Sequence, residues 1–186
     1  MGRREIARLD QSLVRSIAAE FPKGKWRRIT GLEIINANKK TWKSLKHLRK
    51  VGGNYAFLFP ERFFSKEREI LLHAPSRRQV PFRYCLKTIF ASDEYVAAYV
   101  GKASNLAQRI QWHFSLAKRN TGAQVQYGLV NSKICRNRSA AVKFMLEHSI
   151  IYYRDLHGDG HVANRDLLEL SLCARFAPPF NIKSER

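Results

Sequence analysis

The segment EYVAAYVGKASNLAQRIQWHF, residues 94–114, constrains the fold of this chain more than any other stretch. It predicts a strand that ends at Gly101 and passes directly into a helix over residues 104–118. A rotation of about 100° per residue puts His113 near the inward face of this helix and Arg109 at the edge of that face. Because a guanidinium in that position must be paired or must face a cavity, the pattern indicates a candidate functional site.

The charge balance indicates what such a site would bind. The 186 residues carry a formal net charge of +19, with 34 Lys and Arg against 15 Asp and Glu, spread over the whole length. Such a surface is typical of a protein with a polyanionic partner, first of all nucleic acid. A membrane surface is the alternative, but no apolar run approaches the roughly 18 residues of a span. The N-terminus lacks the apolar block of a secretory signal, so we expect an intracellular, cytoplasmic protein.

The order of the predicted elements indicates an α+β fold. In chain order they are helices over 5–20 and 38–53, strands over 53–59 and 68–74, a hairpin of 82–90 with 94–101, the helix described above, a strand over 123–130 and a helix over 139–156. We therefore expect a basic helical and hairpin extension over residues 1–77. Residues 78–186 would form a small antiparallel three-stranded sheet flanked by helices.

Several lysines are candidate contacts for a nucleic-acid backbone. Lys39, Lys43, Lys46 and Lys50 are spaced by four, three and four residues, so they would share one face of the predicted helix. Phosphate contacts and a solvated helix face explain this stripe equally well. Lys102, directly after Gly101, is a further candidate for binding DNA.

The stretch YVGKASNLAQRIQWHF resembles the second half of the signature of the GIY-YIG endonuclease superfamily. That pattern has a tyrosine, a hydrophobic residue and a glycine at a strand end, an arginine ten positions after the tyrosine, and a histidine four further on. Tyr99, Arg109 and His113 match it, and the wording is especially close to the nuclease part of bacterial excision-repair incision subunits. Glu147 in FMLEHSII and Asn181 in PPFNI resemble the later metal-binding glutamate and closing asparagine.

The resemblance leaves two of these positions open. Tyr84 lies fifteen residues before Tyr99, across the short loop ASDE, but lacks the glycine that precedes the first tyrosine of the family. Tyr55 in GNYAFLF keeps a glycine but requires an insertion of about forty residues within the hairpin. Pairing across a short loop favours Tyr84. Asn164 is a weaker competitor for the position of Asn181.

The resemblance implies hydrolysis of a phosphodiester bond with Mg²⁺ or Mn²⁺. Glu147 would hold the ion, although an ion pair with Lys143, four residues earlier, is the alternative role for this carboxylate. Arg109 would bind a phosphate oxygen and stabilise the transition state. Tyr99 or Tyr84 would activate the attacking water once cations lower the pKa of the phenol.

The remaining residues support that reaction. His113 would hold the catalytic tyrosine or relay its proton, and Asn181 would order the glutamate side of the site. Which phenol is the base stays open.

We therefore expect an endonuclease that acts on double-stranded DNA, and the basic additions to its nuclease module make a sequence-specific restriction enzyme the first interpretation. A structure-specific or repair nuclease is one alternative. A non-catalytic nucleic-acid-binding protein on the same fold is the other. A two-fold-symmetric target would imply a homodimer.

Overall fold

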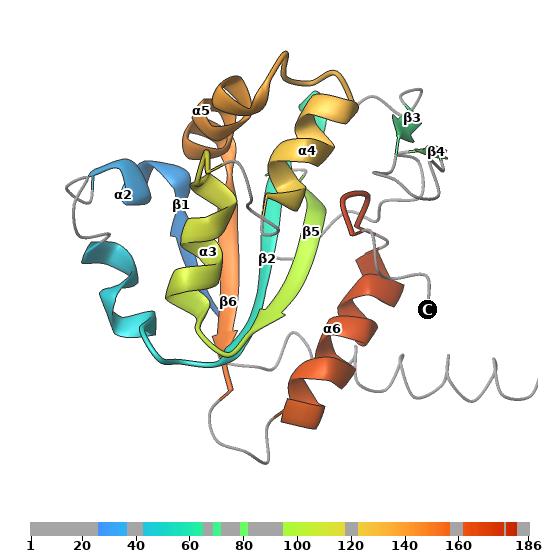
Figure 1. Cartoon of the computed structure of the whole chain (residues 1–186). Helices are drawn as coiled ribbons and strands as arrows, with labels where there is room; N and C mark the ends of the chain where they lie inside the picture. The colour runs from blue at the N-terminus through green and yellow to red at the C-terminus, as the bar shows by residue number, and fades with distance from the viewer. Residues whose placement is uncertain are drawn as a thin grey trace, which may run out of the picture.

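The computed structural model describes residues 26–36, 43–64, 69–71, 79–81, 95–117, 123–156, 162–176 and 178–181. The α+β class is confirmed, but the main sheet has four antiparallel strands and not three (Figure 1). Its order is β1-β6-β2-β5, with bounds Arg27–Thr30 (β1), Ile150–Asp155 (β6), Gly53–Pro60 (β2) and Tyr95–Ala103 (β5). A separate two-stranded sheet pairs β3 (Glu69–Leu71) with β4 (Gln79–Pro81).

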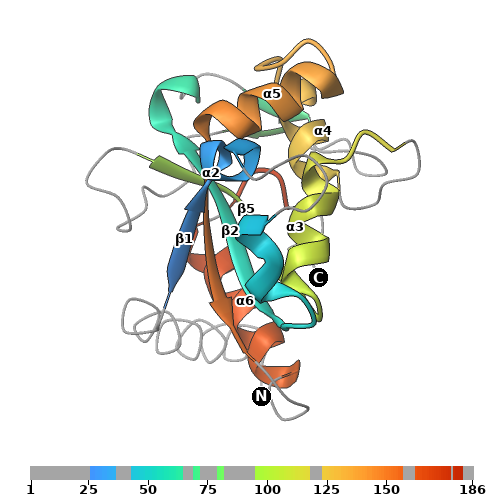
Figure 2. The ribbon, with the colours of Figure 1, turned by 90° about the vertical axis from the view of Figure 1, so that its left-hand side faces the viewer.

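Helices cover both faces of the main sheet. They are α2 (Gly31–Asn36), α3 (Leu106–Phe114), α4 (Gln124–Asn131), α5 (Arg138–His148) and α6 (Val162–Phe176), with short 3-10 helices η2 (Lys43–Leu48) and η3 (Glu61–Phe63). Helices α2 to α5 gather on one face, and α6 packs on the other through Leu168 and Leu172 (Figures 1 and 2). No helix in the described part of the chain is long and apolar enough to cross a membrane.

The central strand β2 explains why the sheet is covered on both sides. All eight of its residues are buried. Its large rings, among them Tyr55 and Phe57, face α3 to α5, while Ala56 and Leu58 face α6. This alternation is the ordinary pleat of a strand with two buried faces.

Helix α4 spans Gln124–Asn131, so the prediction of a strand over 123–130 was wrong. The apolar residues Val125, Tyr127 and Leu129 alternate, but the buried residues include Val125, Gly128 and Leu129, which lie at helical spacing. Gly128 is required here because a Cβ at this position would lie 2.3 Å from the ring of Phe180.

The predicted single helix over 139–156 is in fact a helix followed by a strand. Asn137 caps α5 by accepting a hydrogen bond from the Ala140 N–H at 2.9 Å, and the helix ends at His148. The run IIYY then enters β6, because β-branched and aromatic residues favour a strand between two partners.

The expected division at residue 77 does not separate two units among the described residues. β1 and β2 come from the first part of the chain and pair with β6 and β5 from the second. The strand predicted over 68–74 contributes β3, which pairs with β4 and not with β2. The predicted helix over 5–20 and the predicted strand over 82–90 lie outside the described residues.

Candidate functional site

The pairing of β2 with β5 brings two tyrosines together. Tyr55 lies opposite Gly101 and Phe57 lies opposite Tyr99 in the antiparallel register, so these four residues share the face toward α3. A Cβ on Gly101 would lie 2.7 Å from the Tyr55 phenol, so the glycine makes room for that ring. Tyr55, the other candidate for the first motif tyrosine, therefore lies on the same face as Tyr99, whereas Tyr84 lies outside the described residues.

Helix α3 adds a histidine to the two phenols. Asn105 caps the helix by accepting a hydrogen bond from the Gln108 N–H at 3.1 Å. Two turns later, His113 is fully buried, with its Nε2 2.8 Å from Tyr55 Oη. The ring centroids of Tyr99 and His113 are 4.9 Å apart. The predicted grouping of Tyr99 with His113 is therefore present in the structure.

The end of α3 is anchored by neighbouring helices. The buried Gln126 of α4 donates hydrogen bonds from Nε2 to the carbonyl oxygens of His113 at 2.6 Å and Ser115 at 3.0 Å. Arg138 of α5 donates in turn to Gln126 Oε1 at 2.8 Å. These bonds satisfy carbonyl groups that a helix end otherwise leaves unpaired, and they hold His113 in place.

Burial controls the protonation of this cluster. It lowers the pKa of His113 to about 3, with a further contribution from Arg109, so the imidazole is neutral at physiological pH. It raises the pKa of Tyr55 well above its usual value. Burial also raises the pKa of Tyr99, although Arg109 acts in the opposite direction. Arg109 lowers the pKa of both phenols, as expected for a nearby cation, but in the protein alone the effect of burial is larger.

Arg109 lies at the boundary between this cluster and solvent. Its side chain is half-buried and approaches both Tyr55 and Tyr99. Burial acts to lower the pKa of Arg109, but the two phenols raise it more, so the guanidinium stays charged. Its Cζ lies 5.9 Å from the ring centroid of Trp112, which is 41% exposed.

A cleft of about 360 Å³ opens beside Arg109. It is lined by the end of β5, the first turns of α3 and the start of α6, through Lys102, Ala103, Ser104, Asn105, Gln108, Arg109, Trp112, Val162, Arg165 and Asp166. Polar and cationic side chains therefore surround the space next to the phenol cluster.

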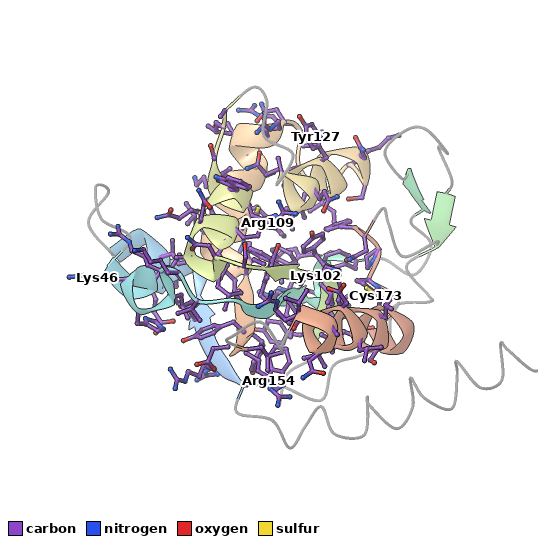
Figure 3. All side chains as sticks on the ribbon, turned by 60° about the horizontal axis from the view of Figure 1, so that its bottom comes forward. Lys46, Lys102, Arg109, Tyr127, Arg154 and Cys173 are labelled. Carbon is purple, nitrogen blue, oxygen red and sulfur yellow. The ribbon has the colours of Figure 1, made fainter. Side chains whose placement is uncertain are left out.

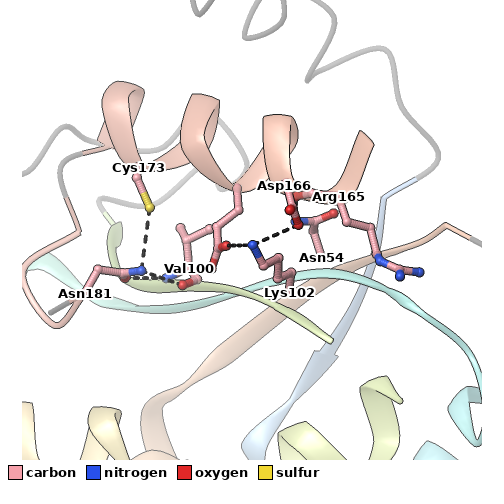
Figure 4. Close-up of polar contacts among 8 residues, drawn as sticks. Asn54, Val100, Lys102, Arg165, Asp166, Cys173 and Asn181 are labelled. Carbon is pink, nitrogen blue, oxygen red and sulfur yellow. Dashed lines mark hydrogen bonds and ion pairs between the residues drawn. The ribbon is translucent and has the colours of Figure 1, made fainter. Parts of the chain in front are cut away.

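Helix α6 brings two carboxylates to this side of β5 (Figure 4). Lys102 Nζ lies 2.8 Å from Asp166 Oδ1 and 3.1 Å from Glu169 Oε2. The negative charge of Glu169 also raises the pKa of Tyr99, so this carboxylate interacts electrostatically with the phenol cluster. Sequence reasoning missed both residues because it predicted no helix or strand after residue 156. The helical spacing of Leu168 and Leu172 was the available signal.

Asn181 is hydrogen-bonded to strand β5. Its Oδ1 accepts a hydrogen bond from the Val100 N–H at 2.8 Å, and its Nδ2 donates to the Val100 carbonyl at 2.6 Å (Figure 4). Its Nδ2 also lies 3.6 Å from Cys173 Sγ on α6. Asn181 therefore fixes β5 between Tyr99 and Gly101, whereas its competitor Asn164 is exposed on α6.

Glu147 does not join the site in the described structure. It lies on α5, and its carboxylate is 3.8 Å from Lys143 Nζ and 3.9 Å from His148 Nε2. α5 packs mainly against α2 and α4 on the face opposite α6. The ion pair with Lys143, the alternative role for this residue, is therefore present, and the expected contact with the tyrosine cluster is not found.

The expected lysine stripe is also changed. Lys46 is exposed on η2, and Lys50 is exposed in the turn that follows, with a left-handed backbone (φ 59°). These two lysines therefore do not share the face of one α-helix. Lys39 and the side chain of Lys43 lie outside the described part.

Comparison with protein-family models, with curated proteins and with solved structures found no match.

Proposed function

We propose that this chain is a metal-dependent DNA endonuclease with a GIY-YIG-like site. The convergence of Tyr55, Tyr99, Arg109 and His113 beside a polar cleft carries the proposal. Phenol, guanidinium and imidazole groups from three separate segments are difficult to explain as core packing alone, because burying them is costly.

The pairing of β2 with β5 also strengthens the resemblance. Gly53-Asn54-Tyr55 stands on β2 where the family has its first motif, and Tyr99-Val100-Gly101 stands opposite on β5. Residues 61–94 would then be an insertion within the motif hairpin. This arrangement supports Tyr55, and not Tyr84, as the first motif tyrosine.

Arg109 and Tyr99 would act directly on the substrate. Arg109 is charged and lines the cleft, so its guanidinium can bind a non-bridging phosphate oxygen and stabilise the charge that develops there. Tyr99 is slightly exposed, unlike the fully buried Tyr55, so we assign the contact with the attacking water to Tyr99. Once its own hydroxyl proton has passed to solvent, the Tyr99 phenolate, which the charge of Arg109 favours, would orient that water and accept its proton.

Tyr55 and His113 would position Tyr99. The low pKa of His113, caused mainly by its burial, makes it a poor final acceptor of a proton. We therefore assign it the task of fixing the Tyr55 hydroxyl through the 2.8 Å contact. Tyr55 then presents a fixed oxygen toward Tyr99 and Arg109.

A divalent ion fits the α6 side of the site better than it fits Glu147. Glu169 and Asp166 supply the hard oxygen donors that Mg²⁺ and Mn²⁺ prefer, with water and phosphate oxygens as further ligands. A bound ion would stabilise the charge on the phosphate and on the leaving oxygen. Neutralising Glu169 would also remove a charge that raises the pKa of Tyr99.

Double-stranded DNA is the proposed substrate, and the charge of +19 supports a polyanion. Figure 3 shows cationic residues on several elements around the site, including Lys46, Lys102, Arg109 and Arg154. Sequence-specific cleavage of the restriction type is the form of the activity that we propose, with each cut requiring the cleft beside Arg109.

The test is cleavage of a mixed set of plasmid and phage DNAs with Mg²⁺ or Mn²⁺. We expect discrete fragments from the wild type, and a loss of about 10³-fold in rate for Arg109→Lys and for Glu169→Gln. Glu147→Gln is the matched control and should cut at close to the wild-type rate. Binding of DNA without cutting by the wild type would instead support a non-catalytic binding protein, and cutting only of branched DNA would support a structure-specific nuclease.

A further inference from the structure

A second tyrosine and histidine pair lies on the same face of the sheet as Tyr55. In the strand register Gly101 is opposite Tyr55, Tyr55 is opposite Tyr153 of β6, and Tyr153 is opposite Arg27 of β1. Tyr153 Oη is 2.9 Å from His47 Nε2, as Tyr55 Oη is 2.8 Å from His113 Nε2. The two pairs therefore stand on neighbouring strands in one row.

The second pair is open to solvent where the first is closed. His113 is fully buried, whereas His47 on η2 is exposed and Arg27 on the edge strand β1 is exposed. Tyr153 is buried, and hydrogen bonding to Arg27 is one of the influences on its pKa. The Tyr153 hydroxyl thus contacts the imidazole of His47 and the guanidinium of Arg27, and both of these groups are accessible to a ligand.

The charges around this group favour an anion. Lys46, Arg49 and Lys50 are exposed on η2 and on the turn after it. Burial is the main cause of the raised pKa of Tyr153, and two carboxylates, Asp155 and Glu33, add to it. Glu33 is occupied by the start of α2, because its Oε2 accepts hydrogen bonds from Thr30 N–H at 2.6 Å and from Thr30 Oγ1 at 2.9 Å.

We propose that Arg27, His47 and Tyr153 bind a backbone phosphate of duplex DNA at a point separate from the cleavage site. Arg27 can donate two parallel hydrogen bonds to phosphate oxygens. His47 Nε2 lies 2.9 Å from Tyr153 Oη, so Nδ1 is the ring nitrogen left to contact the phosphate. The proposal rests on the proposed function, because it takes DNA as the ligand.

The spacing of the two groups suits one DNA strand. Arg27 on β1 stands three strand positions from Gly101 on β5, the strand beside the cleft, a distance of about 14 Å at about 4.8 Å for each pair of strands. A rise of about 3.4 Å per nucleotide converts this distance into about four nucleotides. The second phosphate would therefore lie within a few nucleotides of the cleaved one, and binding it would add affinity for the same DNA strand. Figure 2 shows the molecule from the side of this edge, where β1 lies.

The test measures binding to duplex DNA without divalent ions as a function of salt, for wild type, Arg27→Ala, His47→Ala and Tyr153→Phe. Loss of one phosphate contact should lower the slope of log K against log salt by about 0.9. We expect Arg27→Ala to weaken binding by roughly tenfold at low salt, with a smaller loss for the other two variants.

Arg136→Ala is the matched control, because Arg136 is exposed in the connection from α4 to α5, at the opposite end of the molecule in Figure 1. Equal losses for Arg27→Ala and Arg136→Ala would overturn the proposal, since they would indicate a general effect of charge. A loss with duplex RNA and none with DNA would also overturn it. Thermal unfolding of each variant identifies any that misfold, and for those Arg27→Lys, which keeps the charge and loses the paired donors, replaces the alanine variant. Binding that follows the prediction in a protein that never cuts would refute the proposed nuclease and leave this site standing.

Discussion

The two faces of β5 carry unlike halves of the candidate site. Toward α3, Tyr55 and His113 are 0% exposed and Tyr99 is 4% exposed. Toward α6, the side chains of Lys102, Asp166 and Glu169 are 41%, 51% and 23% exposed and form ion pairs. Because neighbouring residues of a strand point to opposite faces, a single strand can supply a dry hydrogen-bonded half and a solvated ionic half within a few residues.

This difference in solvent exposure means that different physical forces control the two halves. Desolvation dominates on the α3 face, where it raises the pKa of both phenols and lowers the pKa of His113. On the α6 face the bonds to Asp166 and Glu169 raise the pKa of Lys102 although burial acts to lower it. Changes on the dry face should therefore alter stability and proton transfer, and changes on the ionic face should alter ion and salt dependence.

The largest effect should be the acid sensitivity caused by His113. Its folded pKa of about 3 lies below its unfolded value near 6.5, so protons bind to the unfolded chain first. The contribution of this residue to stability is complete above about pH 6.5 and is lost as the pH falls toward about 3, by roughly 5 kcal/mol in all. Urea unfolding across this pH range should show a steeper decline for wild type than for His113→Gln. His47→Gln at the exposed histidine is the control, and an equal decline for wild type and His113→Gln would contradict the assignment.

The next effect should distinguish the two phenols of the dry face. Tyr99→Phe removes the group assigned to contact the attacking water, so the cleavage rate should fall by about 10²-fold to 10³-fold. The hydroxyl also bonds to Tyr55 and Arg109, so about 1 kcal/mol of unfolding free energy should be lost as well. Tyr55→Phe leaves the buried His113 without its 2.8 Å partner, which should cost about 1–3 kcal/mol of stability. Rates and urea unfolding measured on both variants test this division. A greater loss of rate from Tyr55→Phe would exchange the two roles.

The dry half of the site was partly predictable because it is local. Residues 94–114 contain the strand, the glycine, Arg109 and His113 in one continuous stretch, and helix and strand periodicity place these side chains without long-range information. Tyr55 was harder to assign because residues 61–94 separate β2 from β5, and the short loop before Tyr99 favours Tyr84 as the partner in a hairpin.

The ionic half could not be assigned in this way. Glu147 and Glu169 both lie on helices that carry apolar residues, and only the packing of α6 on β5 brings one of them near Tyr99. That packing depends on β6 and α6, which sequence periodicity did not separate from the preceding helix and loop. The choice between the two carboxylates therefore required the tertiary structure.

A moderate effect should follow from filling the space beside Tyr55. Gly101→Ala would put a Cβ 2.7 Å from Cζ and Oη of Tyr55, so the ring must move at a cost of about 1–3 kcal/mol in unfolding free energy. Cleavage should decrease as well, because the hydroxyl that positions Tyr99 is displaced. The cost should be smaller in a Tyr55→Phe background, which lacks Oη. Simple additivity of the two costs would contradict the contact with Oη.

The smallest effect on stability, and the clearest test of the ionic half, should come from Lys102→Met. An exposed ion pair contributes only about 0–1 kcal/mol, so the unfolding free energy should change little. Removing the ammonium group leaves Asp166 and Glu169 to repel each other, and a divalent ion can relieve that repulsion. The concentration of Mn²⁺ needed to raise the melting temperature, and that needed for half-maximal cleavage, should both fall by a few-fold.

Lys143→Met provides the matched control, because Lys143 pairs with Glu147 at 3.8 Å and is 79% exposed. Glu147 is a single carboxylate that also has His148 beside it, so loss of this lysine should leave the Mn²⁺ dependence unchanged. If Lys143→Met changes the Mn²⁺ dependence and Lys102→Met does not, the ion binds at Glu147 on α5, and the assignment of the ionic half to α6 is wrong. Weaker Mn²⁺ binding by Lys102→Met would mean instead that the lysine helps to arrange the two carboxylates, so that the dry and ionic faces of β5 would both depend on fixed geometry.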